Sequence, residues 1–158
     1  MKQTHQNLRA SILDRLIDHE PGISREPVQY CLVSIGQIMD SVIRDLENLL
    51  NTRRQILIPP VEYSRVNNSL FVYGLKDFTS KNPGSPFVRQ RLRQDIEKSI
   101  SRFEPRLKNI TVHLETTAHN ERNLRFRIKG LLVVEPVAEP VTFDTYFDVN
   151  KGEYIISR

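Results

Sequence analysis

The chain is poor in several residue types: its 158 residues include one cysteine, no tryptophan and six glycines. With Cys31 alone no internal disulfide can form, and the first residues hold no apolar leader, so we expect a reducing, cytoplasmic setting. So few glycines leave no glycine-rich phosphate-binding loop. No apolar run approaches the ~20 residues of a membrane-spanning helix, so we expect no direct membrane insertion.

The sequence offers no arrangement typical of a metal centre or a nucleophilic active site. The four histidines, His5, His19, His113 and His119, have no ligand-like spacing to one another, to the cysteine or to a carboxylate. No nucleophile elbow and no Cys/His pair stands out. We therefore expect no metal, no cofactor and no catalytic residue.

The positive charge is modest, since 23 Lys and Arg against 19 Asp and Glu give a formal net charge of +4. Such a charge permits an anionic partner without requiring one. The candidates for a nucleic-acid-binding patch are Arg89, Arg91, Arg93, Arg125, Arg127 and Lys129. The first three spread around a predicted helix and the last three face a predicted acidic strand. We therefore expect a solvated or protein-contacting face and no nucleic acid.

Apolar residues recur at helical spacing near the N-terminus and again from residue 36. Residues 8–17 predict a short helix with one apolar face, formed by Leu8, Ile12, Leu13, Leu16 and Ile17. The stretch "GQIMDSVIRDLENLLNTRR" predicts an amphipathic helix with the stripe Met39, Val42, Ile43, Leu46, Leu49 and Leu50. Arg53 and Arg54 near its end suit the negative pole of the helix dipole.

A long connection, about residues 55–85, follows that helix, and such connections often carry function. Its apolar run Leu70–Tyr73 predicts a brief strand or a packed loop. The third helix starts at Ser85 and Pro86, with the serine hydroxyl as its cap. Its stripe comprises Val88, Leu92, Ile96, Ile100 and Phe103, and Pro105 ends it.

From residue 110 onwards the apolar period changes from helical spacing to two, which predicts strands. The strands are centred on Ile110–Leu114, Leu124–Val134, Val141–Val149 and Tyr154–Ile156, with "EPVAEP" breaking the second from the third. On the solvent face, Arg125, Arg127 and Lys129 should lie opposite Asp144 and Asp148. The predicted fold is therefore α+β, with N-terminal helices packed on an antiparallel meander sheet of three to four strands.

The stretch "SRFEPRL", residues 101–107, lies where the last helix ends and the sheet begins. Its charges are either solvated by chance beside a helix stop, or form a rigid corner for bidentate pairing with a partner. A glycosidase-like use of Glu104, with Asp95 or Glu115 as second carboxylate, is a further alternative. Arg106 argues against it, because a nearby cation lowers a carboxylate pKa whereas a general acid needs a raised one.

Three stretches in order resemble TssE, the baseplate wedge subunit family of type VI secretion systems, which includes a contractile-phage wedge protein often described as a lysozyme. They are "SVIRDLENLLNTRR" from Ser41, "YGLKDFTS" from Tyr73 and "FEPRLKNITV" from Phe103. One departure is Lys76, where related sequences often have proline. The resemblance covers about residues 35–156 and implies an N-terminal helical arm, 1–34, before an α+β baseplate wedge domain, 35–158.

The resemblance implies a structural subunit, not an enzyme, that joins the wedge complex and nucleates polymerisation of the contractile sheath. Its Glu-Pro-Arg hallmark carries partner binding over to Glu104, Pro105 and Arg106. Implied partners are wedge proteins of the TssF, TssG and TssK type and sheath subunits of the TssB/TssC type, in a cytoplasmic baseplate docked at the inner membrane. A peptidoglycan-cleaving enzyme is the main alternative and a nucleic-acid-binding domain the weaker one.

The last predicted strand supplies a second set of candidate binding residues. It comprises Glu153, Tyr154, Ile155 and Ile156, follows a tight turn, and has no later strand to cover it. An edge strand offers backbone groups to another chain. Because the resemblance implies sheath subunits that interlock by donated strands, we expect this edge to accept the first one.

Overall fold

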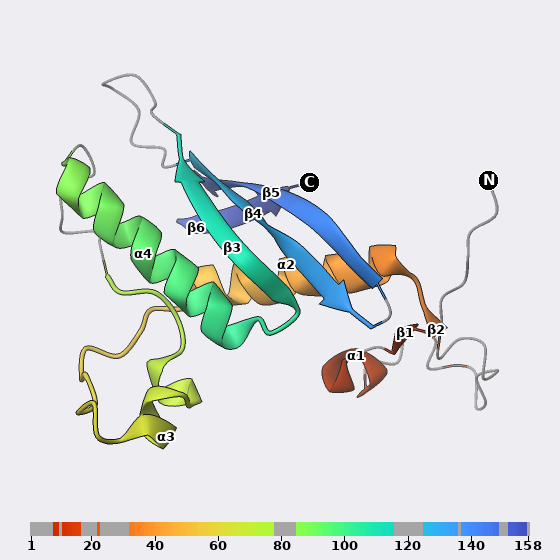
Figure 1. Ribbon diagram of the computed structural model, residues 1–158, viewed down its shortest axis with the longest axis horizontal. Coiled ribbons are helices and arrows are strands. Elements are labelled where there is room, and N and C mark those ends of the chain that lie inside the picture. The colour runs from red at the N-terminus through yellow and green to blue at the C-terminus, as the bar shows by residue number, and fades with distance from the viewer. Residues whose placement is uncertain are drawn as a thin grey trace. The chain divides into compact units, whose positions relative to one another are not determined.

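The computed structural model describes residues 8–9, 11–16, 22, 32–77, 85–115, 125–135, 137–148 and 152–157. The chain forms two compact units, residues 1–44 and 45–158 (Figure 1). Their boundary falls inside one helix, α2 (Ile35–Asn51). The arm of residues 1–34 that the sequence suggests stays a prediction.

The first unit contains α1 (Ile12–Leu16) and a short antiparallel pair, β1 (Leu8–Arg9) with β2 (Leu32–Val33). The prediction of one helix over residues 8–17 is therefore wrong at its start, because Leu8 pairs with Val33 as a strand. Its apolar face is also largely open: Ile12, Leu13 and Leu16 are exposed, whereas Leu8 is buried. Ile17 lies outside the described residues.

Asp14 joins α1 to the first part of α2. Its carboxylate accepts hydrogen bonds from the Ser11 hydroxyl (2.6 Å), the Ser41 hydroxyl (2.8 Å) and the Arg44 guanidinium (2.6 Å). Burial alone would raise the pKa of Asp14, but these hydrogen bonds and the Arg44 charge outweigh burial and lower the pKa from 3.8 to about 2. The carboxylate is thus the favoured form in the folded state.

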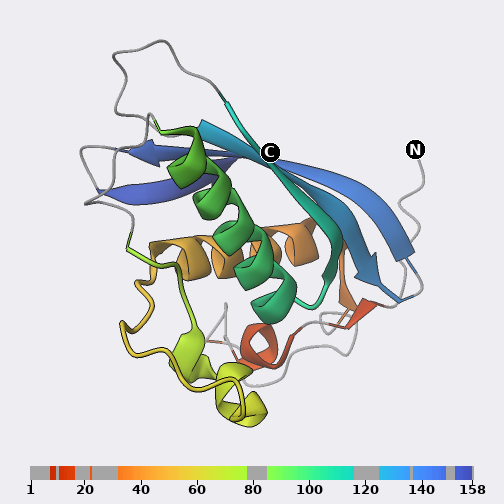
Figure 2. The ribbon, with the colours of Figure 1, turned by 60° about the vertical axis from the view of Figure 1, so that its left-hand side comes forward.

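In its described residues the second unit contains the last part of α2, three further helices and one sheet. The helices are α3 (Ser64–Asn67), the 3-10 helix η2 (Leu70–Val72) and α4 (Pro86–Phe103). The strands are β3 (Leu107–Leu114), β4 (Arg125–Val134), β5 (Val137–Asp148) and β6 (Glu153–Ser157). They pair antiparallel in the order β3-β4-β5-β6, and α4 lies against the sheet (Figure 2). The predicted α+β fold with a meander sheet is confirmed.

The core of the second unit follows the two apolar periods of the sequence. Buried side chains come from α2 (Leu46, Leu49, Leu50), α4 (Leu92, Ile96, Ile100) and the sheet (Leu107, Val112, Phe126, Ile128, Leu132, Val141, Phe143, Ile156). On β4, buried Phe126 and Ile128 alternate with Arg125, Arg127 and Lys129, which leave the core. The helical stripes and the strand alternation therefore meet in one layer between helix and sheet.

The ends of α4 show one confirmed and one wrong expectation. Pro86 occupies the first turn, but the Ser85 side chain makes no capping hydrogen bond, so the predicted hydroxyl cap is wrong. At the other end the helix stops at Phe103, and Glu104 has the non-helical angles φ −119° and ψ 83°. Those angles follow from Pro105, whose ring disfavours helical geometry at the preceding residue.

The connection between β4 and β5 is shorter than the sequence suggested. Within "EPVAEP" the strand resumes at Val137, which pairs with Val134, and Pro140 lies opposite Leu131. Proline has no backbone N–H, so within a sheet it fits only where no neighbouring strand would accept a hydrogen bond from that nitrogen. That condition holds here, because β6 pairs only with residues 144–148 of β5.

The charge ladder across β4 and β5 is only partly as expected. Arg127 lies opposite Asp144 and donates its Nε–H to that carboxylate. Arg125, however, faces Tyr146, and Lys129 faces Thr142. Asp148 lies beyond the described end of β4, and on its other side it is opposite Glu153 of β6. The register thus allows one such ion pair between the described residues of these strands, not several.

The protonation of Asp14 gives a direct test of the first unit. Because its pKa is lowered, the carboxylate stabilises this unit fully above pH ~4, and that contribution is lost as the pH falls towards 2. Carboxyl-carbon NMR of Asp14 should show a midpoint of about 2. Ser41→Ala should raise the midpoint, since one hydrogen bond to the ionised form is removed. A midpoint near 3.8 in the unsubstituted protein would contradict the network.

Candidate functional site

The corner between α4 and β3 contains a bidentate ion pair between Arg106 and Glu104. The Arg106 guanidinium donates from Nε to Glu104 Oε1 (2.7 Å) and from a terminal nitrogen to Oε2 (2.6 Å), and the Arg106 backbone N–H also reaches Oε1 (3.1 Å). Glu104 is 3% exposed, whereas Pro105 between the two is exposed. The sequence placed acid and base together as a binding corner, and the structure shows that they bind each other.

A third charge completes this cluster, which we term the corner cluster: Asp45, Glu104 and Arg106. Asp45 on α2 accepts a 2.6 Å hydrogen bond from Arg106. Burial lowers the pKa of Arg106, but the hydrogen bonds and charges of Glu104 and Asp45 outweigh it and raise that pKa. The guanidinium therefore stays charged between two acids, one on each side of the corner.

Tyr73 borders the corner cluster and connects it to the loop after η2. Its ring meets Phe103 edge-on, with centroids 5.1 Å apart. Burial, followed by the charges of Asp45 and Glu104, raises the pKa of the Tyr73 phenol. The phenol therefore stays neutral beside the two acids. Sequence reasoning missed Asp45 and Tyr73 because each contacts the corner only through the tertiary fold.

A second arginine, Arg54, ties the end of α2 to the same loop and to α4. Its guanidinium donates to the Gly74 carbonyl from Nε (3.0 Å) and from a terminal nitrogen (2.7 Å), and to the Asp95 carboxylate (3.1 Å) and the Ser99 hydroxyl (2.6 Å). The other Asp95 oxygen accepts from the Lys76 backbone N–H at 3.0 Å. The sequence suggested only a helix-dipole role for Arg54, whereas the structure makes it the centre of a buried network.

Gly74 lets the loop come this close to α2. Its φ is +96°, and a Cβ at this position would lie 2.3 Å from the Thr52 carbonyl oxygen. Directly after it, the Leu75 N–H donates to the Thr52 carbonyl and the Arg54 N–H donates to the Leu75 carbonyl. The backbones are thus hydrogen-bonded through a gap that has no room for a side chain.

The three stretches that carry the family resemblance therefore meet in space. The end of α2 supplies Asp45 and Arg54, the loop supplies Tyr73 and Gly74, and the corner supplies Arg106 with its glutamate. Residues 41 positions apart (Arg54 and Asp95) and 61 positions apart (Asp45 and Arg106) thereby form two polar networks within the second unit. Arg54 and Arg106 both bind groups of this same chain, so the convergence of the three stretches fixes the shape of the second unit.

The edge of β6 lies next to α2 rather than open to solvent. The Tyr154 N–H donates to Asn51 Oδ1 (2.7 Å), the Asn51 amide donates back to the Tyr154 carbonyl (3.0 Å), and the Ile156 N–H donates to Glu47 Oε1 (2.9 Å). Both outward donors are therefore already paired with helix side chains. A role for Glu153, Tyr154, Ile155 and Ile156 in binding a partner strand stays a prediction.

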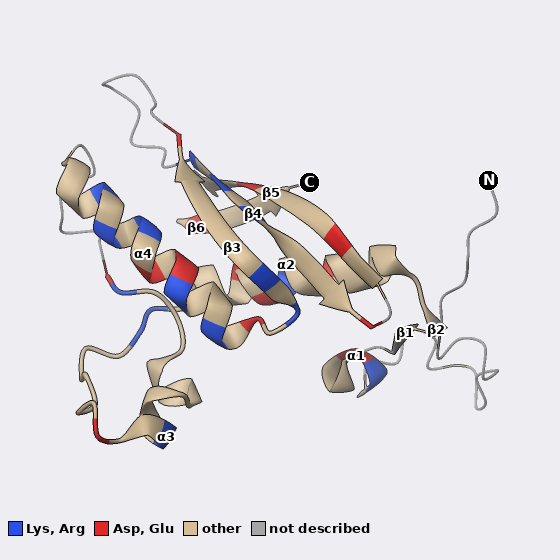
Figure 3. Ribbon diagram, in the orientation of Figure 1, with Lys and Arg blue, Asp and Glu red and all other residues tan. Residues whose placement is uncertain are grey.

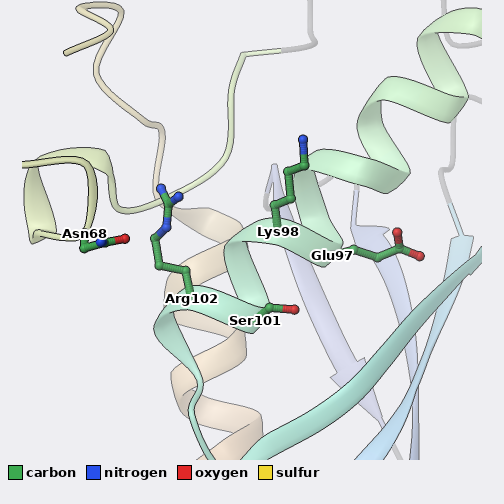
Figure 4. Close-up of a pocket in the computed structure, with 5 residues that line it drawn as sticks. All are labelled: Asn68, Glu97, Lys98, Ser101 and Arg102. Carbon is green, nitrogen blue, oxygen red and sulfur yellow. The ribbon is translucent and has the colours of Figure 1, made fainter. Parts of the chain in front are cut away.

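Two open hollows lie on the second unit. One has a volume of about 710 Å³ and is lined by Asn68, Glu97, Lys98, Ser101 and Arg102 (Figure 4). The other has a volume of about 420 Å³ and lies over β4 and β5 beside Arg127 and Asp144. In the described part of the chain, no group of three or more His, Cys, Asp or Glu residues could hold a metal ion.

Comparison with known proteins identifies the family. Residues 37–137, more than half of the chain, match the family model described as baseplate wedge protein gp25. The chain belongs to this family. The matched region contains the three stretches of the family resemblance (residues 41–54, 73–80 and 103–112) and the corner cluster. The family expected from those stretches is therefore confirmed.

A solved structure has the same fold. A chain of "The baseplate complex from the type VI secretion system" aligns with a TM-score of 0.51 and 19% sequence identity, covering 72% of this chain and 97% of its own. The comparison with curated proteins finds no match. At this identity the likeness shows a shared fold alone, and the detailed role is a separate inference.

The corner cluster predicts a large difference between two Arg–carboxylate pairs of this protein. Glu104→Ala should lower the free energy of unfolding by about 3 kcal/mol, because it leaves half-buried Arg106 with one of its two acids. The control is Asp144→Ala, which breaks the exposed pair with Arg127 and should cost far less. Urea denaturation of the purified proteins measures both, and equal losses would contradict the distinction.

Gly74 offers a second comparison with an internal control. Gly152 also has a positive φ, +72°, but nothing lies within 4 Å of a Cβ placed there. Gly152→Ala should therefore cost only the backbone penalty, about 1 kcal/mol. Gly74→Ala adds the clash with the Thr52 carbonyl and should cost clearly more. Thermal unfolding of the two variants decides this, and a similar loss in both would mean that the loop can move away from α2.

Proposed function

We propose that the chain is a structural subunit of a type VI secretion baseplate that joins the wedge complex and nucleates polymerisation of the contractile sheath. The observation that carries this proposal is the family match over residues 37–137, supported by the shared fold with a chain of a type VI secretion baseplate complex. The partners are wedge proteins of the TssF, TssG and TssK type and sheath subunits of the TssB/TssC type. Residues 1–34 form an arm, and residues 35–158 form the wedge domain.

The corner supports this role through its shape. Exposed Pro105 projects between two residues whose side chains are locked together, and Arg106 keeps 22% of its side chain accessible. We propose that Pro105 and the outer edge of Arg106 contact the neighbouring wedge protein, while Glu104 and Asp45 hold the arginine in position. A fixed guanidinium loses little conformational entropy when it binds a carbonyl or carboxylate of the partner.

Nucleation of the sheath would use the β6 edge. A strand added there must replace the two hydrogen bonds that Tyr154 and Ile156 donate to Asn51 and Glu47. The exchange is favourable only if the incoming strand forms a longer ladder than these side chains provide. The edge would therefore accept a strand of adequate length and leave shorter peptides unbound.

The setting of this proposal is a cytoplasmic baseplate docked at the inner membrane. None of the helices in the described residues is long and apolar enough to cross a membrane. Attachment to the membrane would then come from other components of the machine. The chain would lie in the cytoplasm as part of the complex it joins.

A peptidoglycan-cleaving enzyme is the alternative, and the corner argues against it. Both oxygens of Glu104 accept hydrogen bonds from Arg106, and the carboxylate is buried. A general acid must hold a proton that it can deliver to a glycosidic oxygen. Glu104 is buried with both oxygens in contact with Arg106, so it lacks the access to a substrate that this step needs.

The proposal predicts the outcome of a complementation experiment. In a strain lacking the chromosomal copy and carrying a fluorescent sheath subunit, Arg106→Ala should abolish extended sheaths while the variant remains folded by circular dichroism. Arg127→Ala, which removes an arginine from an exposed pair, should restore normal sheaths. Normal sheaths with a folded Arg106→Ala variant would remove the corner from assembly. Clearing of a peptidoglycan suspension by the purified protein, lost in Glu104→Gln, would instead favour the enzyme.

A further inference from the structure

The segment from Ile56 to Phe71 exposes more large apolar side chains than any other described stretch of this length. The exposed side chains are Ile56, Leu57, Ile58, Val61, Tyr63, Val66, Leu70 and Phe71. We term this set the apolar segment. Ile56 and Val61 are the extremes, at 97% and 93% exposed. A concentration of exposed large apolar side chains within one short stretch is a candidate interaction site.

Hydrogen bonds hold the apolar segment in shape. Asn67 donates its side-chain amide to the Pro60 carbonyl (2.9 Å) and the Tyr63 carbonyl (3.1 Å). The Ser69 hydroxyl accepts from the Phe71 N–H (3.2 Å) and donates to the Val66 carbonyl (2.8 Å). These bonds fix a turn around α3 and η2 with its apolar side chains outward. A surface already ordered in this way loses little entropy when it is covered.

A basic hollow adjoins the apolar segment. It is the larger hollow, which is lined by Asn68, between α3 and η2, and by residues of α4 that include Lys98 and Arg102 (Figure 4). Lys98 and Arg102 are exposed, and within the described residues neither has an ion-pair partner. Figure 3 shows how basic residues recur along α4. The hollow thus combines two cations with the side-chain amide of Asn68, and these groups can bind carboxylate oxygens.

The one acid that lines the hollow is occupied elsewhere. Glu97 accepts a hydrogen bond from the Val112 backbone N–H of β3 at 2.9 Å and lies 4.0 Å from Arg93. In Figure 4 its carboxylate points away from Lys98 and Arg102. The charge presented towards the apolar segment is therefore positive. An occupant must be apolar on one side and negatively charged beside it.

We propose that the apolar segment and the basic hollow together dock an acidic amphipathic helix of another baseplate protein. Lys98 and Arg102 lie four residues apart on one helix, a spacing that matches two carboxylates four residues apart on the helix that binds. Apolar side chains of the same helix would cover Leu70 and Phe71. This inference rests on the proposed function, because it takes the occupant from the baseplate.

Protein chemistry fits this surface better than a lipid bilayer does. Recruitment to anionic lipid uses clusters of about four to eight Lys and Arg, each worth about 1 kcal/mol. The hollow offers two such residues, and the stretch of residues 56–71 adds one exposed acid, Glu62, and one exposed base, Arg65. Two cations of defined spacing select carboxylates by position rather than by number. The surface therefore favours a partner with a fixed pattern of charges.

The experiment uses photo-crosslinking in cells with a working secretion system. Benzoylphenylalanine at Ile58 should crosslink to a peptide of another baseplate protein that carries two carboxylates one helical turn apart. Lys98→Glu with Arg102→Glu should lower the yield at least about tenfold, since like charges then meet. Reversing the two carboxylates on the mapped peptide to lysine should restore it. Arg91→Glu with Lys129→Glu changes the net charge equally at exposed sites outside the hollow and should leave the yield unchanged.

Baseplate foci of a fluorescent fusion separate failure of this inference from failure of the proposed function. Foci with no crosslink from Ile58, or with crosslinks only to lipid or to a second copy of the chain, would overturn the docking surface alone. So would an unchanged yield in the Lys98→Glu/Arg102→Glu variant. The absence of foci for the unsubstituted protein would overturn the proposed function, and the docking of a baseplate helix with it.

Discussion

The second unit depends on the guanidinium of Arg106, which stands between Glu104 and Asp45 and so fixes the end of α4 against α2. Arg54, near the end of α2, makes a similar set of contacts: its guanidinium donates to the Gly74 carbonyl and to the Asp95 carboxylate. Buried ion pairs add little net stability, because desolvation offsets most of their attraction. Their value is geometric. Moving α2 away would separate Asp45 from Arg106 and Arg54 from Asp95.

That constraint explains why an acid, a proline and a base occur together at the corner. Pro105 ends the helix and turns the chain, which brings Arg106 back within reach of the carboxylate two residues earlier. The backbone N–H of Arg106 joins the same carboxylate, so the turn is closed by main chain and side chain together. The result is a rigid projection at the start of the sheet. Rigidity of this kind is what an assembly contact needs from a small subunit.

Much of the fold could be predicted, because local pattern decides it. The helical stripe around Leu46, the alternation around Phe126 and the stop before Pro105 each follow from neighbouring residues. Contacts between distant residues could not be predicted in this way. Leu8 lies in a strand only because Val33 pairs with it. The contacts of Arg54 and Asp45, and the helix side chains that bind the β6 edge, cannot be recognised from the spacing of residues in the sequence. The corner residues came from family resemblance, whereas their mutual pairing came from the structure.

The two outer strands of the sheet are protected by the same device. On β3 the Val112 N–H donates to Glu97 of α4, and on β6 the Ile156 N–H donates to Glu47 of α2. In each case a helix carboxylate takes the position that the carbonyl of a further strand would occupy. Unpaired edges promote aggregation, and one carboxylate for each edge reduces that risk without another strand. Each cap consists of one or two side chains, Glu97 on β3 and Glu47 with Asn51 on β6, so a strand that forms several ladder bonds can displace it. A sheet closed in this way can remain unextended in the free subunit and still be extended within an assembly.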